Sequence, residues 1–155
     1  MTRTRVVEPW LREPLERFVR ETGARLVLLL TPAGQVLAQF GFTRAVDVMS
    51  AAALASGIAA STGELARMLN EREFRALNHQ SRRHGVFLAR FGSPRGPLLA
   101  LVVYGADSSV GLVQLFFEQL AADLSAAAPT APAPAPLLGH DFERDLNESL
   151  ASLFR

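Results

Sequence analysis

The spacing of apolar residues predicts a helix near each end of the first 127 residues. Within residues 8–22, apolar side chains recur every three or four positions, and Gly23 is a typical helix stop. The other helix runs to Leu124 with the same spacing, and Ser108 or Ser109 is expected to cap its start. Both helices are therefore expected to bury one face against a shared core.

Five strands are expected between these helices. Residues 25–31 and 98–104 are apolar on both faces, which is typical of central strands covered by helices on both sides. Residues 75–80 are polar and are expected to form an edge strand. The other two expected strands are residues 36–40 and 86–91.

A long Ala-rich helix over residues 47–69 interrupts the strands. The stretch has no proline and few β-branched residues, so its helix propensity is high. Asp47 is expected to cap its start and Asn70 to end it. The order is then helix, two strands, long helix, three strands and helix. It predicts an α+β fold in which an antiparallel five-stranded sheet lies between helices.

At 100° per residue the long helix has three faces, each defined here by its residues. The bulky stripe is Ala51, Leu54, Ile58, Leu65 and Leu69. The small stripe is Val48, Ala52, Ala55, Ala59 and Ala66. The third face, which carries few charges, is Met49, Ala53, Ser56, Ala60, Glu64 and Arg67.

These faces predict different neighbours. The bulky stripe is expected to cover the core of its own chain, whereas small side chains allow a helix of another chain to approach closely. The alternative is that alanine is frequent only because it favours helices. The weakly charged third face is unusual for a solvated helix, so it is expected to contact a partner.

The C-terminal part has a different composition. Residues 128–136 alternate Ala and Pro, which favours an extended tether, and they separate a domain at 1–127 from a helix at 137–155. A short isolated helix is marginal in water, so this one is expected to fold by docking its apolar face. Its target is either a groove on a partner protein or, alternatively, its own domain or its dimer mate. The apolar face is Phe142, Leu146, Leu150, Leu153 and Phe154.

Composition excludes several classes of function. The chain has no cysteine, which excludes disulfides and thiol catalysis, and its net charge of +1 gives no field for nucleic acid or an anionic membrane. Unbroken apolar runs such as 26–30 and 51–55 are far shorter than a membrane span, and no apolar signal core follows the basic N-terminus. A soluble cytoplasmic protein without nucleic-acid binding or membrane insertion is expected.

No catalytic or metal-binding constellation is recognisable. His79, His84 and His140 do not pair at metal-ligand spacing, so neither a metal nor a cofactor is expected. Arg82 and Arg83 could act as an arginine finger, but two solvated turn residues are the simpler interpretation. We therefore expect no active site in this chain.

Several local stretches resemble the roadblock/dynein-light-chain superfamily, and within it the MglB-like regulators of bacterial Ras-like GTPases. The resemblance covers roughly residues 15–125. It is carried by Gly23-Ala-Arg-Leu-Val27, Pro32-Ala-Gly-Gln-Val-Leu37, Ala55-Ser-Gly-Ile-Ala-Ala60, Leu65-Ala-Arg-Met-Leu69, Glu73-Phe74, Leu99-Ala-Leu-Val-Val103 and Ser109-Val-Gly-Leu-Val113. The tail from Asp145 to Phe154 resembles the short C-terminal helix of that group.

The resemblance implies a homodimer that binds an MglA-type Ras-like small GTPase and stimulates GTP hydrolysis without an arginine finger, in cell polarity or motility. A scaffold dimer that recruits a protein without changing its turnover is the alternative. The implied dimer interface is Val48, Ala52, Ala55, Ala59, Arg75, Leu77 and His79. The implied GTPase surface is Met49, Ala53, Ser56, Ala60, Arg67, Phe142, Leu146, Leu150 and Phe154.

Overall fold

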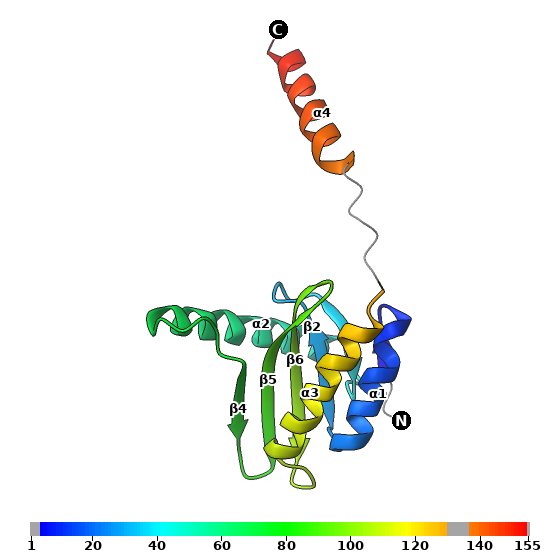
Figure 1. Ribbon diagram of the computed structural model, residues 1–155, viewed down its shortest axis with the longest axis vertical. Helices are drawn as coiled ribbons and strands as arrows, with labels where there is room; N and C mark the ends of the chain where they lie inside the picture. Colours follow the sequence, from blue (N-terminus) through cyan, green and yellow to red (C-terminus); the bar gives the residue numbers. More distant parts are fainter. Residues whose placement is uncertain (1–3, 130–136, 155) are drawn as a thin grey trace.

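A six-stranded antiparallel sheet forms the centre of the protein (Figure 1). The computed structural model describes residues 4–129 and 137–154, and for 137–143 and 145 it describes the backbone only. The strand order is β1-β3-β2-β6-β5-β4. The strands are β1 (Thr4–Val6), β2 (Leu26–Leu30), β3 (Val36–Phe40), β4 (Ala76–Gln80), β5 (His84–Ser93) and β6 (Gly96–Gly105).

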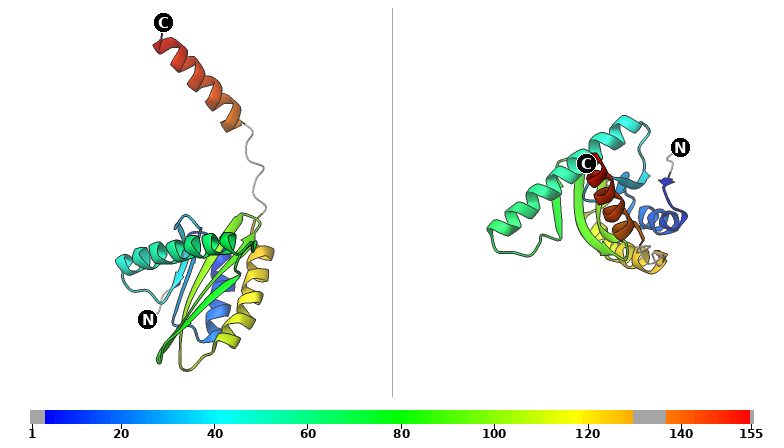
Figure 2. Two further views of the ribbon diagram at one scale, coloured as in Figure 1. Left: turned by 90° about the vertical axis from the view of Figure 1, so that its left-hand side faces the viewer. Right: turned by 90° about the horizontal axis from the view of Figure 1, so that it is seen from above.

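Helices cover the sheet on both sides, as the fully apolar strands predicted (Figure 2). Helices α1 and α3 lie on one face, and the long helix α2 crosses the other face. The helices are α1 (Arg12–Thr22), α2 (Ala45–Met68), α3 (Val110–Ala127) and α4 (Leu137–Leu153), with a short 3-10 turn, η1 (Pro9–Leu11), before α1.

The strand that the sequence did not predict is β1. It lies beyond β3, where Thr4 pairs with Phe40 and Val6 with Ala38, so the sheet has six strands and not five. Three residues are too few to display the period-two pattern by which a strand is recognised. The backbone of β3 supplies the hydrogen bonds that fix it.

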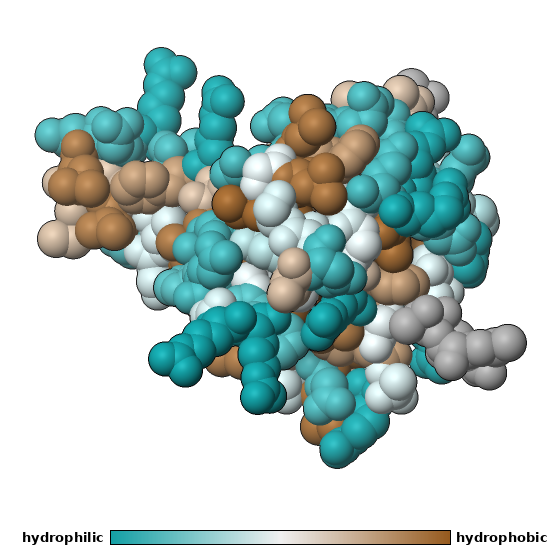
Figure 3. Space-filling model, turned by 90° about the horizontal axis from the view of Figure 1, so that it is seen from below, coloured by the Kyte–Doolittle hydropathy of each residue, from teal (hydrophilic) through white to brown (hydrophobic). Residues whose placement is uncertain are grey.

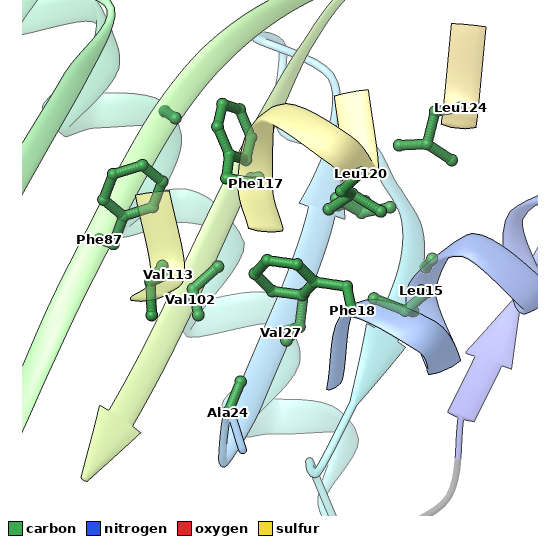
Figure 4. Packing of buried hydrophobic residues seen from close by; sticks show 14 of the residues in the cluster. Leu15, Phe18, Ala24, Val27, Phe87, Val102, Val113, Phe117, Leu120 and Leu124 are labelled. Carbon is green, nitrogen blue, oxygen red and sulfur yellow. The ribbon is translucent and has the colours of Figure 1, made fainter. Parts of the chain in front are cut away.

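The larger core fills the space between the sheet and helices α1 and α3 (Figure 4). Phe18 of α1 and Phe117 of α3 point into it from the helices, while Val27 and Phe87 come from strands. The rings of Phe87 and Phe117 meet edge to face with centroids 5.4 Å apart, a favoured arrangement for aromatic pairs. This layer holds α1 and α3 against the central strands.

A smaller core lies between the sheet and α2. It contains Leu28, Leu30, Leu88 and Leu99 from strands and Val48, Ala52 and Ala55 from the helix. The small stripe, and not the bulky stripe, therefore covers the chain's own sheet. The physical reason is that leucines on the sheet supply the bulk, so methyl-sized helix residues let the helix axis approach closely.

The predicted helix ends are partly confirmed. Gly23 ends α1 with φ 67°, and Ser109 caps α3 by accepting a hydrogen bond of 3.2 Å from the Leu112 amide. The prediction that Asp47 caps α2 is wrong, because the N-cap is Arg44 and Asp47 lies in the first turn. There a carboxylate still interacts favourably with the helix dipole. Asn70 follows the helix with φ 58°, a conformation that asparagine tolerates.

Candidate partner-binding surface

The most conspicuous surface feature is the row of large apolar side chains left exposed along α2. Four of its bulky residues are between 38% and 67% exposed: Leu54, Ile58, Leu65 and Leu69. Met49 and Met68 are 72% and 76% exposed. Apolar groups gather at the protruding end of α2 in Figure 3. A helix with this much uncovered apolar surface is typical of a protein–protein contact.

A hydrogen bond fixes how α2 is rotated on the sheet. The Ser56 hydroxyl donates to the carbonyl of Pro32 at 2.6 Å, so that flank faces the turn between β2 and β3. Ile58 lies about 200° round the helix from Ser56 and faces the opposite way. The bulky stripe therefore borders the part of the sheet that α2 leaves partly uncovered, where Leu77 and Leu101 are half-buried.

Strand β4 presents an open edge beside this surface. It pairs with β5 on one side, and no described strand pairs with its other side. Leu77 and His79 alternate onto the same face as α2, and Arg75 precedes the strand, where its carbonyl accepts from the Arg90 amide at 3.1 Å. This confirms the prediction that 75–80 is a polar edge strand. Unpaired N–H and C=O groups make such an edge suited to pairing with another strand.

The predicted dimer-interface residues do not lie together on the surface. Val48, Ala52 and Ala55 are at most 8% exposed and pack on their own sheet, and Ala59 packs partly against the same core. Val48, Ala52 and Ala55 are therefore core residues in this chain, and Ala59 lies half-buried at the rim of the same core. The sequence assigned Leu54, Ile58, Leu65 and Leu69 to the chain's own core, whereas the structure leaves these four side chains exposed. The spacing of these four residues is visible in the sequence, but a stripe of large apolar residues normally indicates a core position. Only the large side chains on the facing sheet show that the helix must place small residues there instead.

The predicted GTPase surface on α2 is solvent-facing apart from Ser56, which is half-buried. Met49, Ala53 and Ala60 are exposed on the third face of the helix, which is called the outer face from here on. Arg67 is exposed too, and its guanidinium bonds to the Glu64 carboxylate at 2.8 Å. The face therefore presents small apolar groups and one neutralised charge pair.

In helix α4 and at the residue that follows it, the described members of the predicted contact set are exposed. Leu146 is 47%, Leu150 43% and Phe154 87% exposed. Phe142 falls among the residues whose side chains lie outside the description. The amphipathic pattern is therefore present in a helix, with its apolar stripe on the surface.

Among the described residues, no group of three or more His, Asp or Glu side chains could hold a metal ion. Arg82 and Arg83 are exposed beside the turn between β4 and β5. By length and composition alone α2 could cross a membrane, but here its small stripe packs on the sheet.

A carboxyl group with a lowered pKa lies at the opposite edge of the molecule. The Trp10 indole donates a 2.5 Å hydrogen bond to the Glu8 carboxylate, which also forms an ion pair with Arg95. These two contacts, the hydrogen bond first, hold the pKa of the Glu8 carboxyl below its usual value, although desolvation opposes the shift. This cluster joins the turn before α1 to the β5–β6 hairpin. It is a structural contact and not part of the α2 surface.

Comparison with solved structures gives close matches among MglB proteins. Myxococcus xanthus MglB aligns with a TM-score of 0.69 and 23% identity, over 77% of this chain and 95% of that one. The gliding protein MglB of Thermus thermophilus aligns with a TM-score of 0.68 and 31% identity, over 79% and 90%. A structure described as MglB with a tetrameric arrangement gives 0.66 and 31%, over 76% and 87%.

Sequence comparison leads to the same family. No curated protein sequence matches the chain significantly. The Roadblock/LC7 domain family, however, matches residues 11–103, which include all of β2 to β5 and the whole of α2. The chain therefore belongs to the Roadblock/LC7 family, and within it the protein is MglB-like.

Proposed function

We propose that this protein is a homodimeric regulator that binds a Ras-like small GTPase of the MglA type and stimulates its GTP hydrolysis, in the control of cell polarity or motility. The observation that carries the proposal is α2, an MglB-like long helix whose bulky stripe and outer face are both left uncovered. Two uncovered faces on one helix suit two different neighbours.

The first neighbour is a second copy of the chain. The open edge of β4 and the bulky stripe of α2 lie on the same side of the protein, so one partner can pair with the strand and cover the stripe together. Pairing removes unsatisfied backbone groups, and covering leucines removes apolar surface from water. A structure of an MglB relative has a tetrameric arrangement, which is consistent with self-association in this group.

The second neighbour is the GTPase. The outer face of α2 presents Met49, Ala53, Gly57 and Ala60, and a Cβ added at Gly57 would meet nothing within 4 Å in this chain. Small side chains on an outward face allow the backbone of a partner to come close. Methionine adapts to irregular contact surfaces, which suits the other end of the same face.

The charges on the described surface support stimulation without an arginine finger. The arginine on the outer face, Arg67, is engaged by Glu64, and Arg82 and Arg83 lie at the far end of β4. A regulator of this kind acts by binding more tightly to the GTPase conformation in which its own catalytic groups are in place. The rate gain is then limited by the differential affinity of the regulator for that conformation.

The decisive experiment is GTP turnover by an MglA-type GTPase with increasing amounts of the full chain. We expect acceleration that saturates near two chains per GTPase. Tight binding with unchanged turnover would support the scaffold alternative, and no binding would refute the proposal.

A matched variant tests the arginine mechanism. Arg82→Ala/Arg83→Ala should accelerate turnover as well as the unaltered chain, because neither side chain belongs to the outer face of α2. Loss of acceleration with retained binding in this variant would show instead that a turn arginine enters the GTPase site.

A further inference from the structure

A second apolar surface lies on the opposite face of the sheet from α2. A groove of about 650 Å³ runs between α3 and the start of β4. Its apolar lining includes Phe87 and Phe91 of β5 and Phe117 of α3, and Leu115 of α3 is 65% exposed at its side. The ring centroids of Phe91 and Phe117 are 5.5 Å apart, and both rings are at most 9% exposed, so the groove lies along the rim of the larger core.

The groove exists because the covering helices do not extend to the edge of the sheet. Helix α3 packs on β5, while β4 lies one strand further out. Ala76 pairs with Ala89 and faces the same side as the buried phenylalanines. A small residue on β4 beside an exposed leucine on α3 leaves an open channel at this edge of the sheet.

The chain carries an amphipathic helix of matching character. In α4 the apolar residues Leu146, Leu150 and Leu153 recur on one face, and all three are between 43% and 76% exposed. Figures 1 and 2 show α4 apart from the sheet and its covering helices. A helix-in-groove contact is formed by such a stripe of i, i+4 and i+7 residues on an apolar floor.

The length of the tether permits this contact within one chain. Helix α3 ends at Ala127 and α4 begins at Leu137. Ten residue steps of Ala-Pro composition span up to about 30 Å, at roughly 3 Å each. The groove lies beside the first three turns of α3, whose last lining residue, Ala121, is about 9 Å from the helix end at 1.5 Å per residue.

The charges at the groove are compatible with this occupant. Its lining includes Glu73, Arg75, Arg90 and Glu118. Glu73 and Arg90 are 3.9 Å apart, whereas Arg75 has no carboxylate within salt-bridge distance among the described residues. Residues 137–155 carry four acidic side chains against two arginines, so the tail brings an excess of negative charge. An acidic tail therefore favours the side of the groove near Arg75.

We propose that the groove between α3 and β4 is the docking site of helix α4, supplied by the same chain or by its dimer mate. Docking covers the apolar stripe of the tail together with Leu115 and the rim of the larger core. It also makes the exposure of the tail helix a regulated property, because a partner that takes α4 must first remove it from the groove.

The absence of cysteine from the chain makes a direct distance measurement possible. Gln119→Cys on α3 and Ser152→Cys on α4 take one spin label each, and pulsed electron resonance measures the distance between the labels in the full-length protein. We expect a short, narrow distance between positions 119 and 152, in addition to any distances between like positions of the two chains in a dimer. Leu150→Glu should abolish it, while the neighbouring Ala151→Glu, which adds the same charge on the polar side, should preserve it.

A substitution in the groove tests the same contact from its other side. Leu115→Glu alters an exposed side chain and should also abolish the short distance while circular dichroism shows an unchanged fold. Mixing singly labelled chains shows whether α4 docks on its own chain or on its mate. A broad distribution in the unaltered sequence, or equal effects of Leu150→Glu and Ala151→Glu, would overturn the proposal. No GTPase is present, so the result is independent of the proposed activity.

Discussion

The hydroxyl of Tyr104 in β6 donates a hydrogen bond of 3.0 Å to the side-chain oxygen of Asn78 in β4, although β5 lies between the two strands. The contact crosses β5 at Gly85, which pairs directly with Tyr104. A Cβ at Gly85 would lie 2.0 Å from Cζ of the tyrosine ring. Because Gly85 has no side chain, the Tyr104 ring of β6 can pass over β5 and hold the edge strand β4 through Asn78.

Gly85→Ala should destabilise the protein by about 1–3 kcal/mol, because the added methyl group and the buried Tyr104 ring cannot occupy the same space. Tyr104→Phe keeps the ring and should cost only about 0.5–1.5 kcal/mol, the usual contribution of one hydrogen bond. Urea unfolding of both variants measures the difference. Equal midpoints for Gly85→Ala and the unaltered chain would show that the ring does not cross at this position.

The order of the elements could be predicted from the sequence, but the rotation of α2 could not. Strands 26–30 and 98–104 display their burial in their composition, and the central sheet follows from that. Helix α2 is apolar on several faces, so its periodicity does not select the inward one. The inward face is fixed by large side chains on the sheet, such as Leu28 and Leu99, against which the small alanines of α2 pack. Strand β1 could not be predicted either, because its three residues form a strand only by pairing with β3.

Leu54→Arg should weaken the homodimer, because the side chain is 67% exposed on the bulky stripe that we assign to the second copy. The adjacent Ala53→Arg lies about 100° away on the outer face and should leave the dimer intact while reducing GTPase binding. Sedimentation measures the first effect and titration with the GTPase measures the second. If both variants behaved alike, the assignment of two faces to two neighbours would be wrong.

Ala55→Arg should act on folding and not on assembly. Ala55 is 1% exposed beneath α2, so the new guanidinium would be buried among leucines of the sheet without a partner. We expect a loss of several kcal/mol, enough to leave much of the protein unfolded. Circular dichroism and thermal melting test this. A folded Ala55→Arg protein that is merely monomeric would restore Ala55 to the dimer interface.

Gly57→Ala should stabilise the isolated chain by about 0.5–1 kcal/mol, because glycine is unfavourable inside a helix. A Cβ at this position meets nothing within 4 Å, so no steric penalty offsets the gain. If the GTPase backbone approaches this face closely, the same substitution should raise the Kd of the complex. Thermal melting and GTPase titration of one variant therefore separate a helix defect from a contact site.

The ionised form of Glu8 should stabilise the fold. Its carboxylate accepts a hydrogen bond from Trp10 and pairs with Arg95, which lowers its pKa in the folded protein. The stabilisation is then present above the unfolded pKa and is lost as the pH falls through the lower folded value. Trp10 is the only tryptophan, so the NMR shift of its indole N–H reports the titration directly. We expect the midpoint below the ordinary glutamate value and no such transition in Glu8→Gln, whose stability at acidic pH should fall less. A midpoint at or above the ordinary value would show that the cluster does not hold the charged form.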